Sequence, residues 1–132
     1  ETMKAELKNT SYEEAIPKVT AALAQQGFGV LTTIDTRATF KKKLDVDTHP
    51  RTILGACNPH FAIKALEFAP EMSLLMPCNV VVEERDGQVL VNAIDPKLMG
   101  QFSPEAMETP EFVAILEEAD GKMRKAMESL SD

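Results

Sequence analysis

The chain has no tryptophan, one tyrosine and only two cysteines, and these scarcities exclude several classes of protein. Two cysteines are too few for a disulfide scaffold, and without a C-x-x-C pair there is no redox motif of the thioredoxin kind. No run approaches the roughly 18 consecutive apolar residues of a membrane span. The net charge of -7 shows a deficit of basic residues, which disfavours nucleic acids and anionic membranes as partners.

The signature motifs of common enzymes are also missing. The sequence contains no glycine-rich phosphate loop, no G-x-S-x-G elbow and no H-E-x-x-H. Residues 3–9 lack the basic and apolar regions of a secretion signal. We therefore expect a cytoplasmic protein that is not an enzyme, that uses no cofactor and whose cysteines are reduced.

What is present is the composition of one globular domain. The 132 residues include 44% apolar and 27% charged residues, which suits a single hydrophobic core spanning residues 1–132. Strands and helices are mixed along the chain, which predicts the α+β class. The predicted strands are residues 3–8, 28–34, 52–57, 80–85 and 88–94. The predicted helices are residues 12–26, 36–44, 59–68 and 110–130.

Capping residues set the expected starts of the helices. Ser11 and Glu14 have the S-x-x-E spacing of a capping box. Pro17 lies inside the apolar pattern that follows, so we expect either a bend or a later start of this helix. Asp35 is the expected N-cap of the second helix. Asn58 is the expected N-cap of the third, with proline at the first helical position.

The last predicted helix carries the longest apolar stripe and follows a connection, residues 96–110, that has no clear period. We expect that connection to cross the surface. The stripe keeps helical spacing through Phe112, Ile115, Leu116, Ala119, Met123, Ala126, Met127 and Leu130. Such a helix must bury its stripe, either in its own domain or against a second subunit.

The strongest local signal is a hairpin around Asp86-Gly87, the dipeptide that best accepts a type I′ turn. A two-residue loop pairs Arg85 with Gln88 and, if the ladder continues far enough, Cys78 with Asp95. The face predicted to point into the core is apolar and consists of Val80, Val82, Val89, Val91 and Ala93.

Two Cys-Asn dipeptides form the candidate site. Cys57 ends a predicted strand just before a helix N-terminus, where the helix dipole favours a thiolate, although a small buried apolar role is the plainer alternative. Cys78 opens the hairpin strand. Asn58 and Asn79 have structural alternatives as a helix cap and a strand start. Asp95 either orients a polar ligand or begins an Asx turn.

A metal site would use the C-x-x-H spacing of Cys57 and His60. Cys78, Met72 and Met76 would add soft donors. One half-motif does not supply the four ligands of structural zinc, and methionines commonly fill gaps in a core. We therefore expect no metal.

Several segments resemble a known family. The two segments that contain the Cys-Asn dipeptides, residues 53–59 and 74–82, resemble the family called domain of unknown function 302. The resemblance extends to three further segments, residues 14–15, 26–31 and 34–44. The resemblance covers about residues 3–100 and leaves the last helix outside. It implies a TATA-binding-protein-like architecture, an antiparallel sheet with helices packed on one face, and a homodimer. It also implies that both Cys-Asn pairs gather at one place, but it implies no reaction.

Three functional hypotheses follow. The first is a non-enzymatic homodimeric domain that binds a small ligand or a peptide at Cys57, Asn58, Cys78, Asn79 and Asp95. The second is a thiol-based enzyme or redox sensor that uses Cys57. The third is a structural oligomerisation module, in which the last helix buries its stripe against a second subunit.

Overall fold

Five antiparallel strands form one sheet in the order β1-β5-β4-β3-β2 in the structure, a computed structural model that describes residues 2–130. The strands are β1 (Thr2–Leu7), β2 (Gly29–Asp35), β3 (Arg51–Cys57), β4 (Cys78–Arg85) and β5 (Gln88–Ile94). The α-helices are α1 (Tyr12–Gln25), α2 (Thr36–Leu44), α3 (Pro59–Phe68) and α4 (Pro110–Glu128). Three 3-10 helices are η1 (Pro70–Leu75), η2 (Pro96–Phe102) and η3 (Ala106–Glu108).

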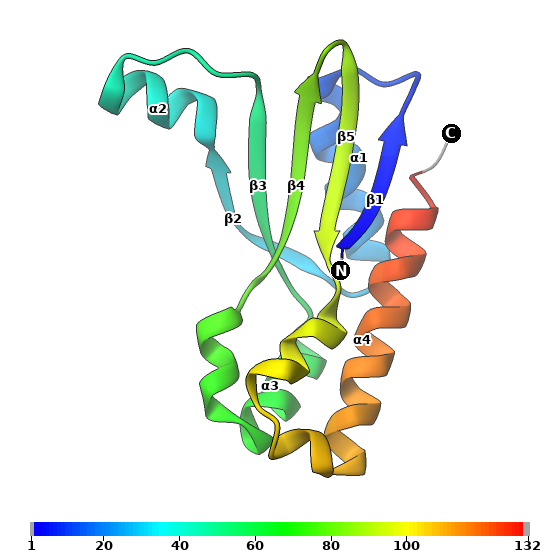
Figure 1. Cartoon of the computed structure of the whole chain (residues 1–132). Helices are drawn as coiled ribbons and strands as arrows, with labels where there is room; N and C mark the ends of the chain where they lie inside the picture. The colour runs from blue at the N-terminus through cyan, green and yellow to red at the C-terminus, as the bar shows by residue number, and fades with distance from the viewer. Residues whose placement is uncertain (1, 131–132) are drawn as a thin grey trace.

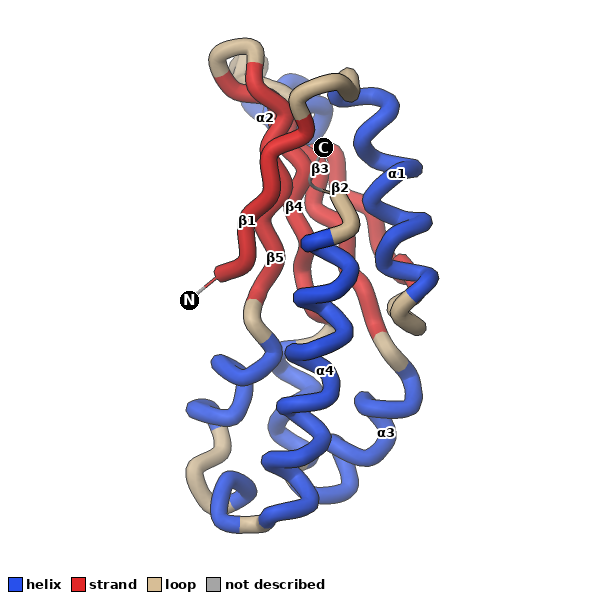
Figure 2. Tube along the Cα trace, turned by 90° about the vertical axis from the view of Figure 1, so that its right-hand side faces the viewer, coloured by secondary structure: helices blue, strands red, loops and turns tan. Residues whose placement is uncertain are grey.

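The helices cover one face and one end of the sheet. Helices α1 and α4 lie on the same face (Figure 2), whereas α3 and the three 3-10 helices gather beyond the end where β3 stops and β4 starts (Figure 1). Helix α2 projects from the opposite end, beside the edge strand β2 (Figure 1). The α+β class and the antiparallel sheet with helices on one face are confirmed. No helix within residues 2–130 combines the length and the apolar character needed to cross a membrane.

The hairpin has the predicted turn and register. Asp86 and Gly87 have φ angles of 53° and 79°, as a type I′ turn requires, and Arg85 pairs with Gln88. All five residues of the predicted core face are buried. The extension of the ladder to Cys78 and Asp95 is wrong, because β5 ends at Ile94 and Cys78 pairs with Ala56 of β3.

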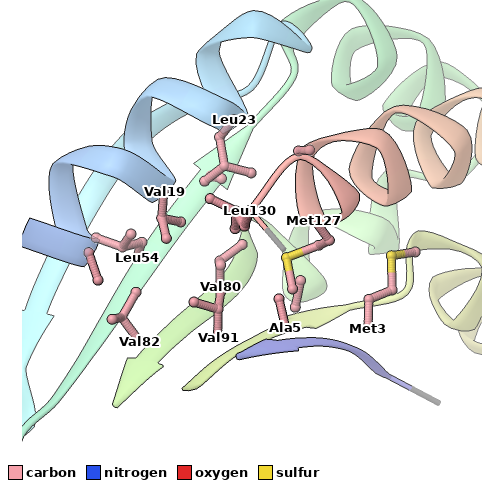
Figure 3. Close-up of a cluster of buried hydrophobic side chains, with 14 of the residues drawn as sticks. Met3, Ala5, Val19, Leu23, Leu54, Val80, Val82, Val91, Met127 and Leu130 are labelled. Atoms are coloured by element: carbon pink, nitrogen blue, oxygen red, sulfur yellow. The ribbon is translucent and has the colours of Figure 1, made fainter. Parts of the chain in front are cut away.

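The main core lies between the sheet and helices α1 and α4 (Figure 3). Val19 and Leu23 of α1 pack against the sheet, and Leu130, just after α4, packs beside them. Their partners on the strands include Leu54 and Val80, both almost fully buried. Side chains alternate between the two faces along β4 and β5, so every second one points into this layer. The alternation of apolar residues in the sequence therefore predicted the core face of the hairpin.

Helix α1 begins directly at its capping box. The Ser11 hydroxyl accepts from the Glu14 amide at 3.1 Å, and the Glu14 carboxylate accepts from the Ser11 amide at 3.2 Å. Pro17 lies within the helix, so the later start that it suggested is wrong. Asp35 caps α2 as predicted, through a 2.9 Å hydrogen bond from the Ala38 amide.

The connection 96–110 is not a simple surface crossing. It folds into η2 and η3, and its residues Met99 and Ala106 are buried against Phe112 and Leu116 of α4 in a second hydrophobic cluster. Helix α4 therefore buries its stripe inside its own chain, half against the sheet and half against this cluster. This removes the reason for placing a second subunit against that helix.

Candidate functional site

A cavity of about 50 Å³ lies where the end of β3 meets the start of β4. Both cysteines and Asn58 line it, and apolar side chains of α3, η1, η2 and α4 form the remaining wall. The two Cys-Asn dipeptides thus meet at this end of the sheet because β3 and β4 are antiparallel neighbours. The cavity is partly open to solvent, and both cysteines are partly exposed.

Asn58 is the polar residue of this wall. The residue is only 7% exposed, and its Nδ2 donates to the Gln26 carbonyl at 3.2 Å. That carbonyl can only accept, so the amide nitrogen must face it and Oδ1 must point elsewhere. Oδ1 is buried and has no hydrogen-bond partner within the described chain. An unpaired buried acceptor costs about 1–3 kcal/mol, which a ligand that donates a hydrogen bond would recover.

The position of Asn58 differs from its predicted role in one respect. It is the N-cap residue of α3, but its side chain makes no capping hydrogen bond. Instead the amide reaches across to the end of α1, where a Cβ on Gly27 would lie 2.9 Å from Nδ2. The absence of a side chain at Gly27 therefore allows the amide to sit between α1 and α3.

The thiols are held in the protonated form. Burial raises the pKa of the Cys57 thiol, although the residue precedes a helix N-terminus. Burial, and to a smaller extent the neighbouring Cys57 thiol, raise the pKa of Cys78 to about 11. Burial therefore opposes the thiolate that the helix dipole would favour at Cys57, and it supports the plainer alternative of a small, neutral side chain.

Cys78 also contacts a residue that the sequence did not suggest. Its Sγ lies 3.8 Å from Sδ of Met99, which comes from η2 and lines the same cavity. Met99 lies 21 positions from Cys78 in a segment without periodicity, so no signal in the sequence pointed to it.

Two predicted residues lie away from the cavity. Asn79 is exposed and pairs with Gly55 on the face of the sheet that α1 and α4 leave uncovered. His60, in the first turn of α3, is exposed and does not line the cavity. Three residues of the two Cys-Asn dipeptides, Cys57, Asn58 and Cys78, therefore meet at the cavity. His60 does not join Cys57 there, so the C-x-x-H spacing does not produce a pair of metal ligands.

Asp95 begins an Asx turn, the structural alternative to binding a ligand. Its Oδ1 accepts from the Lys97 amide at 2.9 Å, the Asx turn that begins η2. Its side chain also faces the buried Asp120 of α4. Burial and the Asp95 carboxylate raise the pKa of Asp120. The pKa of Asp95 is lowered instead, because the hydrogen bonds that it accepts from Asp120 and from the Lys97 amide outweigh the effect of burial. Arg124, 3.4 Å from Asp120, offsets part of the repulsion.

A site for a hard metal ion is not supported. Within residues 2–130 no three His, Cys, Asp or Glu side chains come together in a way that could hold an ion. The polar amide that lines the cavity belongs to Asn58, and Asp120 is engaged with Lys97 in tying η2 to α4.

The fold and part of the sequence are similar to those of other proteins. A crystal structure described as "uncharacterized conserved protein DUF302" from Bacillus stearothermophilus superposes with a TM-score of 0.83, covering 96% of this chain and 95% of that chain at 23% identity. An "Uncharacterized protein" of Aquifex aeolicus is 32% identical over 89 residues. That match covers 65% of this chain and 60% of the length of the relative.

The family match extends further than the resemblance in the sequence suggested. It spans residues 3–130 and so includes α4, which was expected to lie outside. None of these descriptions states a function. The chain belongs to the family described as "Domain of unknown function DUF302".

Proposed function

We propose that this protein is a non-enzymatic domain that binds a small ligand in the cavity at the ends of β3 and β4. The observation that carries the proposal is Asn58, which lines an otherwise apolar cavity and whose buried Oδ1 has no hydrogen-bond partner within the described chain. Native proteins seldom leave such groups unsatisfied except where a ligand or water completes them. The thiols nearby are neutral, so they neither attract nor repel a charge.

The cavity also restricts what the ligand is. Drug-sized pockets measure about 300–1,000 Å³, whereas this cavity is about 50 Å³ and admits only a few heavy atoms. A peptide is therefore disfavoured. The matching ligand is a small neutral molecule with an apolar body and one N–H or O–H donor.

A pair of probes tests this assignment. In amide NMR titrations of the protein, 1-propanol should produce saturable shifts around Asn58 and Cys78. Methyl propyl ether has a similar apolar body but no donor, and it should bind about 10-fold more weakly, because one hydrogen bond is worth about 1–1.5 kcal/mol. Replacing Asn58 with leucine should abolish the preference for the alcohol.

Asn79→Leu provides the matched control, because Asn79 is exposed and lies outside the cavity. This variant should keep the preference of the wild type. Equal binding of the alcohol and the ether by the wild-type protein, or no shift at the cavity with either, would show that Asn58 does not bind a ligand.

We infer further that two copies pair through β2. This edge strand has one strand neighbour, β3, and exposes Leu31 and Ile34 by 68% and 48%. The opposite edge strand, β1, carries Lys4 and Glu6, charges of the kind that prevent strands from pairing. Beyond the bulge at Leu31, residues 32–35 of β2 are regular, and the carboxylate of their one charged residue, Asp35, accepts from the Ala38 amide as the cap of α2. Antiparallel pairing of this run with its own copy is self-complementary, as a two-fold dimer requires.

Sedimentation equilibrium tests the dimer. The wild-type chain should be dimeric at micromolar concentration, and Ile34→Lys should weaken association by at least about 10-fold, because a charge would enter the paired edge. Ile63→Lys changes an isoleucine that is 63% exposed on α3 and should leave association unchanged. A monomeric wild type, or equal effects of the two substitutions, would refute pairing through β2.

The site also agrees with a cytoplasmic location. Cys57 and Cys78 are free thiols in the structure, and the reducing cytoplasm keeps thiols in this form.

A further inference from the structure

A carboxyl group is buried beside the cavity, where η2 packs against α4 (Figure 1). Asp120, in the middle of α4, is only 5% exposed. The charged groups that face it are Asp95 and Lys97 at the start of η2 and Arg124 one turn further along α4. A buried carboxylate is costly unless it is paired and hydrogen-bonded. The pairing of Asp120 therefore decides how firmly η2 is held on α4.

The two cations are loose partners of Asp120. Lys97 Nζ and Arg124 Nη2 lie 3.7 Å and 3.4 Å from its oxygens, and both cationic side chains are more than half exposed. Charge-assisted N–H···O bonds are shorter, about 2.7–2.9 Å. Asp120 is also hydrogen-bonded to Asp95, and two carboxyl groups can share a hydrogen bond only if one of them carries a proton. Burial and Asp95 raise the pKa of Asp120, so the carboxyl pair, Asp95 and Asp120, carries one proton and Asp120 holds it.

The residues next to the carboxyl pair form part of the cavity wall. Pro96 follows the first carboxyl group, Ala119 precedes the second, and both residues line the cavity. The contact between η2 and α4 is also close further along, because a Cβ on Gly100 would lie 2.9 Å from Cδ1 of Leu116. One wall of the cavity therefore consists of residues on both sides of this contact. Separation of the two helices would widen the cavity.

We propose that the carboxyl pair is a latch, which holds η2 on α4 while it carries one proton and releases η2 when that proton is lost. In the closed latch the Asp120 hydroxyl donates to the Asp95 carboxylate. On opening, the Asp120 O–H bond breaks, the proton passes to water, and the two carboxylates repel each other. Lys97 and Arg124 offset part of this repulsion, so they lower the pH at which the latch opens. The inference rests on the proposed function only in taking the cavity as the ligand site, and it adds how that site is regulated.

Helix η2 is the element that moves. Helix α4 is anchored by Met123, Ala126 and Met127, which are buried in the main core against the sheet, whereas a 3-10 helix such as η2 has poorer hydrogen-bond geometry than an α-helix. Met99 of η2 covers Cys78, with Sδ 3.8 Å from Sγ. Movement of η2 would therefore uncover the Cys78 thiol. It would also enlarge a cavity that admits only a few heavy atoms while the latch is closed.

The opening depends on pH in a definite direction. The closed latch binds the proton more tightly than the open one, because the pKa of Asp120 is raised in the closed structure and returns toward its ordinary value once the group is solvated. As the pH rises between these two pKa values, the open state gains up to about 10-fold per pH unit. Above the higher value the ratio of open to closed protein is constant. The pKa of Asp95 is lowered, so its own titration lies below this range.

Reaction of the Cys78 thiol measures the opening. The reagent is 4,4′-dithiodipyridine, which reacts with thiols in acid as well as in neutral solution, and the parent protein carries Cys57→Ser so that Cys78 is its only thiol. Asp120→Asn in this parent keeps a donor for Asp95 at every pH, so its latch should stay closed. The rate for the parent divided by the rate for D120N should increase between pH 4 and pH 8, by about 10-fold for each unit by which the pKa of Asp120 is raised. The ionisation of the thiol itself cancels in this ratio.

Two further variants of the parent provide the control and an independent reading. Glu118→Gln removes an exposed carboxyl group of α4 and should react like the parent at every pH. Arg124→Gln removes a cation that favours ionised Asp120, so its increase in rate should occur at higher pH. Thermal unfolding at each pH shows whether a variant is folded, and R124Q decides the question if D120N is not.

Three results would overturn the latch. The first is a parent-to-D120N ratio that does not change with pH. The second is a ratio that decreases as the pH rises, which is the effect of a charge on Asp120 that disfavours the Cys78 thiolate without any movement. The third is an R124Q protein whose rate increases at the same pH as that of the parent.

The propanol titration separates this inference from the proposed function, because the thiol reaction involves no ligand. A preference for the alcohol together with a constant reaction ratio would remove only the latch. A ratio that increases with pH, without any preference for the alcohol, would remove the role of Asn58 and leave the latch in place.

Discussion

Replacing Phe112 with alanine is expected to lower the free energy of unfolding by about 3–5 kcal/mol, the largest effect of any substitution considered for this protein. Phe112, in the first turn of α4, is fully buried in the second hydrophobic cluster. Its ring packs edge-on against that of Phe68, with centroids 6.2 Å apart and planes at 67°. The variant would lose the apolar area, leave a cavity and remove this aromatic contact, which adds about 0.5–1.5 kcal/mol.

Phe102→Ala provides the control for this change. Phe102 also lies in the helical end of the molecule, which consists of α3, the three 3-10 helices and the start of α4, but it is 46% exposed. Its loss should cost about 1 kcal/mol or less, because a half-exposed ring leaves no closed cavity. Urea unfolding followed by circular dichroism measures both variants. If the two cost the same, the helical end of the molecule is not a packed core.

The Phe112 cluster also matters for the site. Leu116 and Met99 belong both to this cluster and to the wall of the cavity. A loosened cluster would release η2 from α4, so the Phe112 variant should also weaken ligand binding. The helical end therefore shapes the site as well as adding stability.

Replacing Gly55 with alanine is expected to cost about 1–3 kcal/mol, because it overpacks the centre of the sheet. Gly55 lies in β3 between Thr32 of β2 and Asn79 of β4. A Cβ there would overlap the Thr32 hydroxyl and would lie 2.7 Å from Cγ of Pro77. The proline ring cannot rotate away as a flexible side chain can, so a strand must move.

Two further variants make this prediction specific. Gly29→Ala places the same methyl group on β2, where no atom lies within 4 Å of the new Cβ. It should be neutral or stabilising by up to about 1 kcal/mol, because alanine restricts the unfolded chain. Thr32→Ala combined with Gly55→Ala should cost less than the sum of the two single changes, because the first removes part of the overlap. Equal effects of Gly55→Ala and Gly29→Ala in urea unfolding would contradict the close approach.

Local signals predicted most of the elements. The hairpin register followed from Asp86-Gly87, since a two-residue loop determines which residues face each other. The starts of α1 and α2 followed from Ser11 and Asp35, because a cap bonds to amides only three residues away. Residues 96–110 were misread because 3-10 turns have no apolar period that a sequence pattern reveals.

The candidate site was only partly predictable. That Cys57 and Cys78 meet was implied by the family resemblance, and the pairing of β3 with β4 explains it. The alternation of side chains along β4 separates Cys78 from Asn79, so the second asparagine faces away. Met99 reaches Cys78 because η2 folds back over the end of the sheet, a long-range event that spacing along the chain does not encode.

The sequence alone determined the hydrophobic faces, the turn, the helix caps and the class of fold, because these depend on interactions between residues close in the chain. The tertiary structure decided which thiols, amides and thioethers share a cavity, and it decided that both thiols stay protonated. The physical reason is that the burial of a side chain and its distance from other side chains depend on which distant segments of the chain pack together. The helix dipole that favours a thiolate at Cys57 is a local effect, and the burial that opposes it comes from the whole fold.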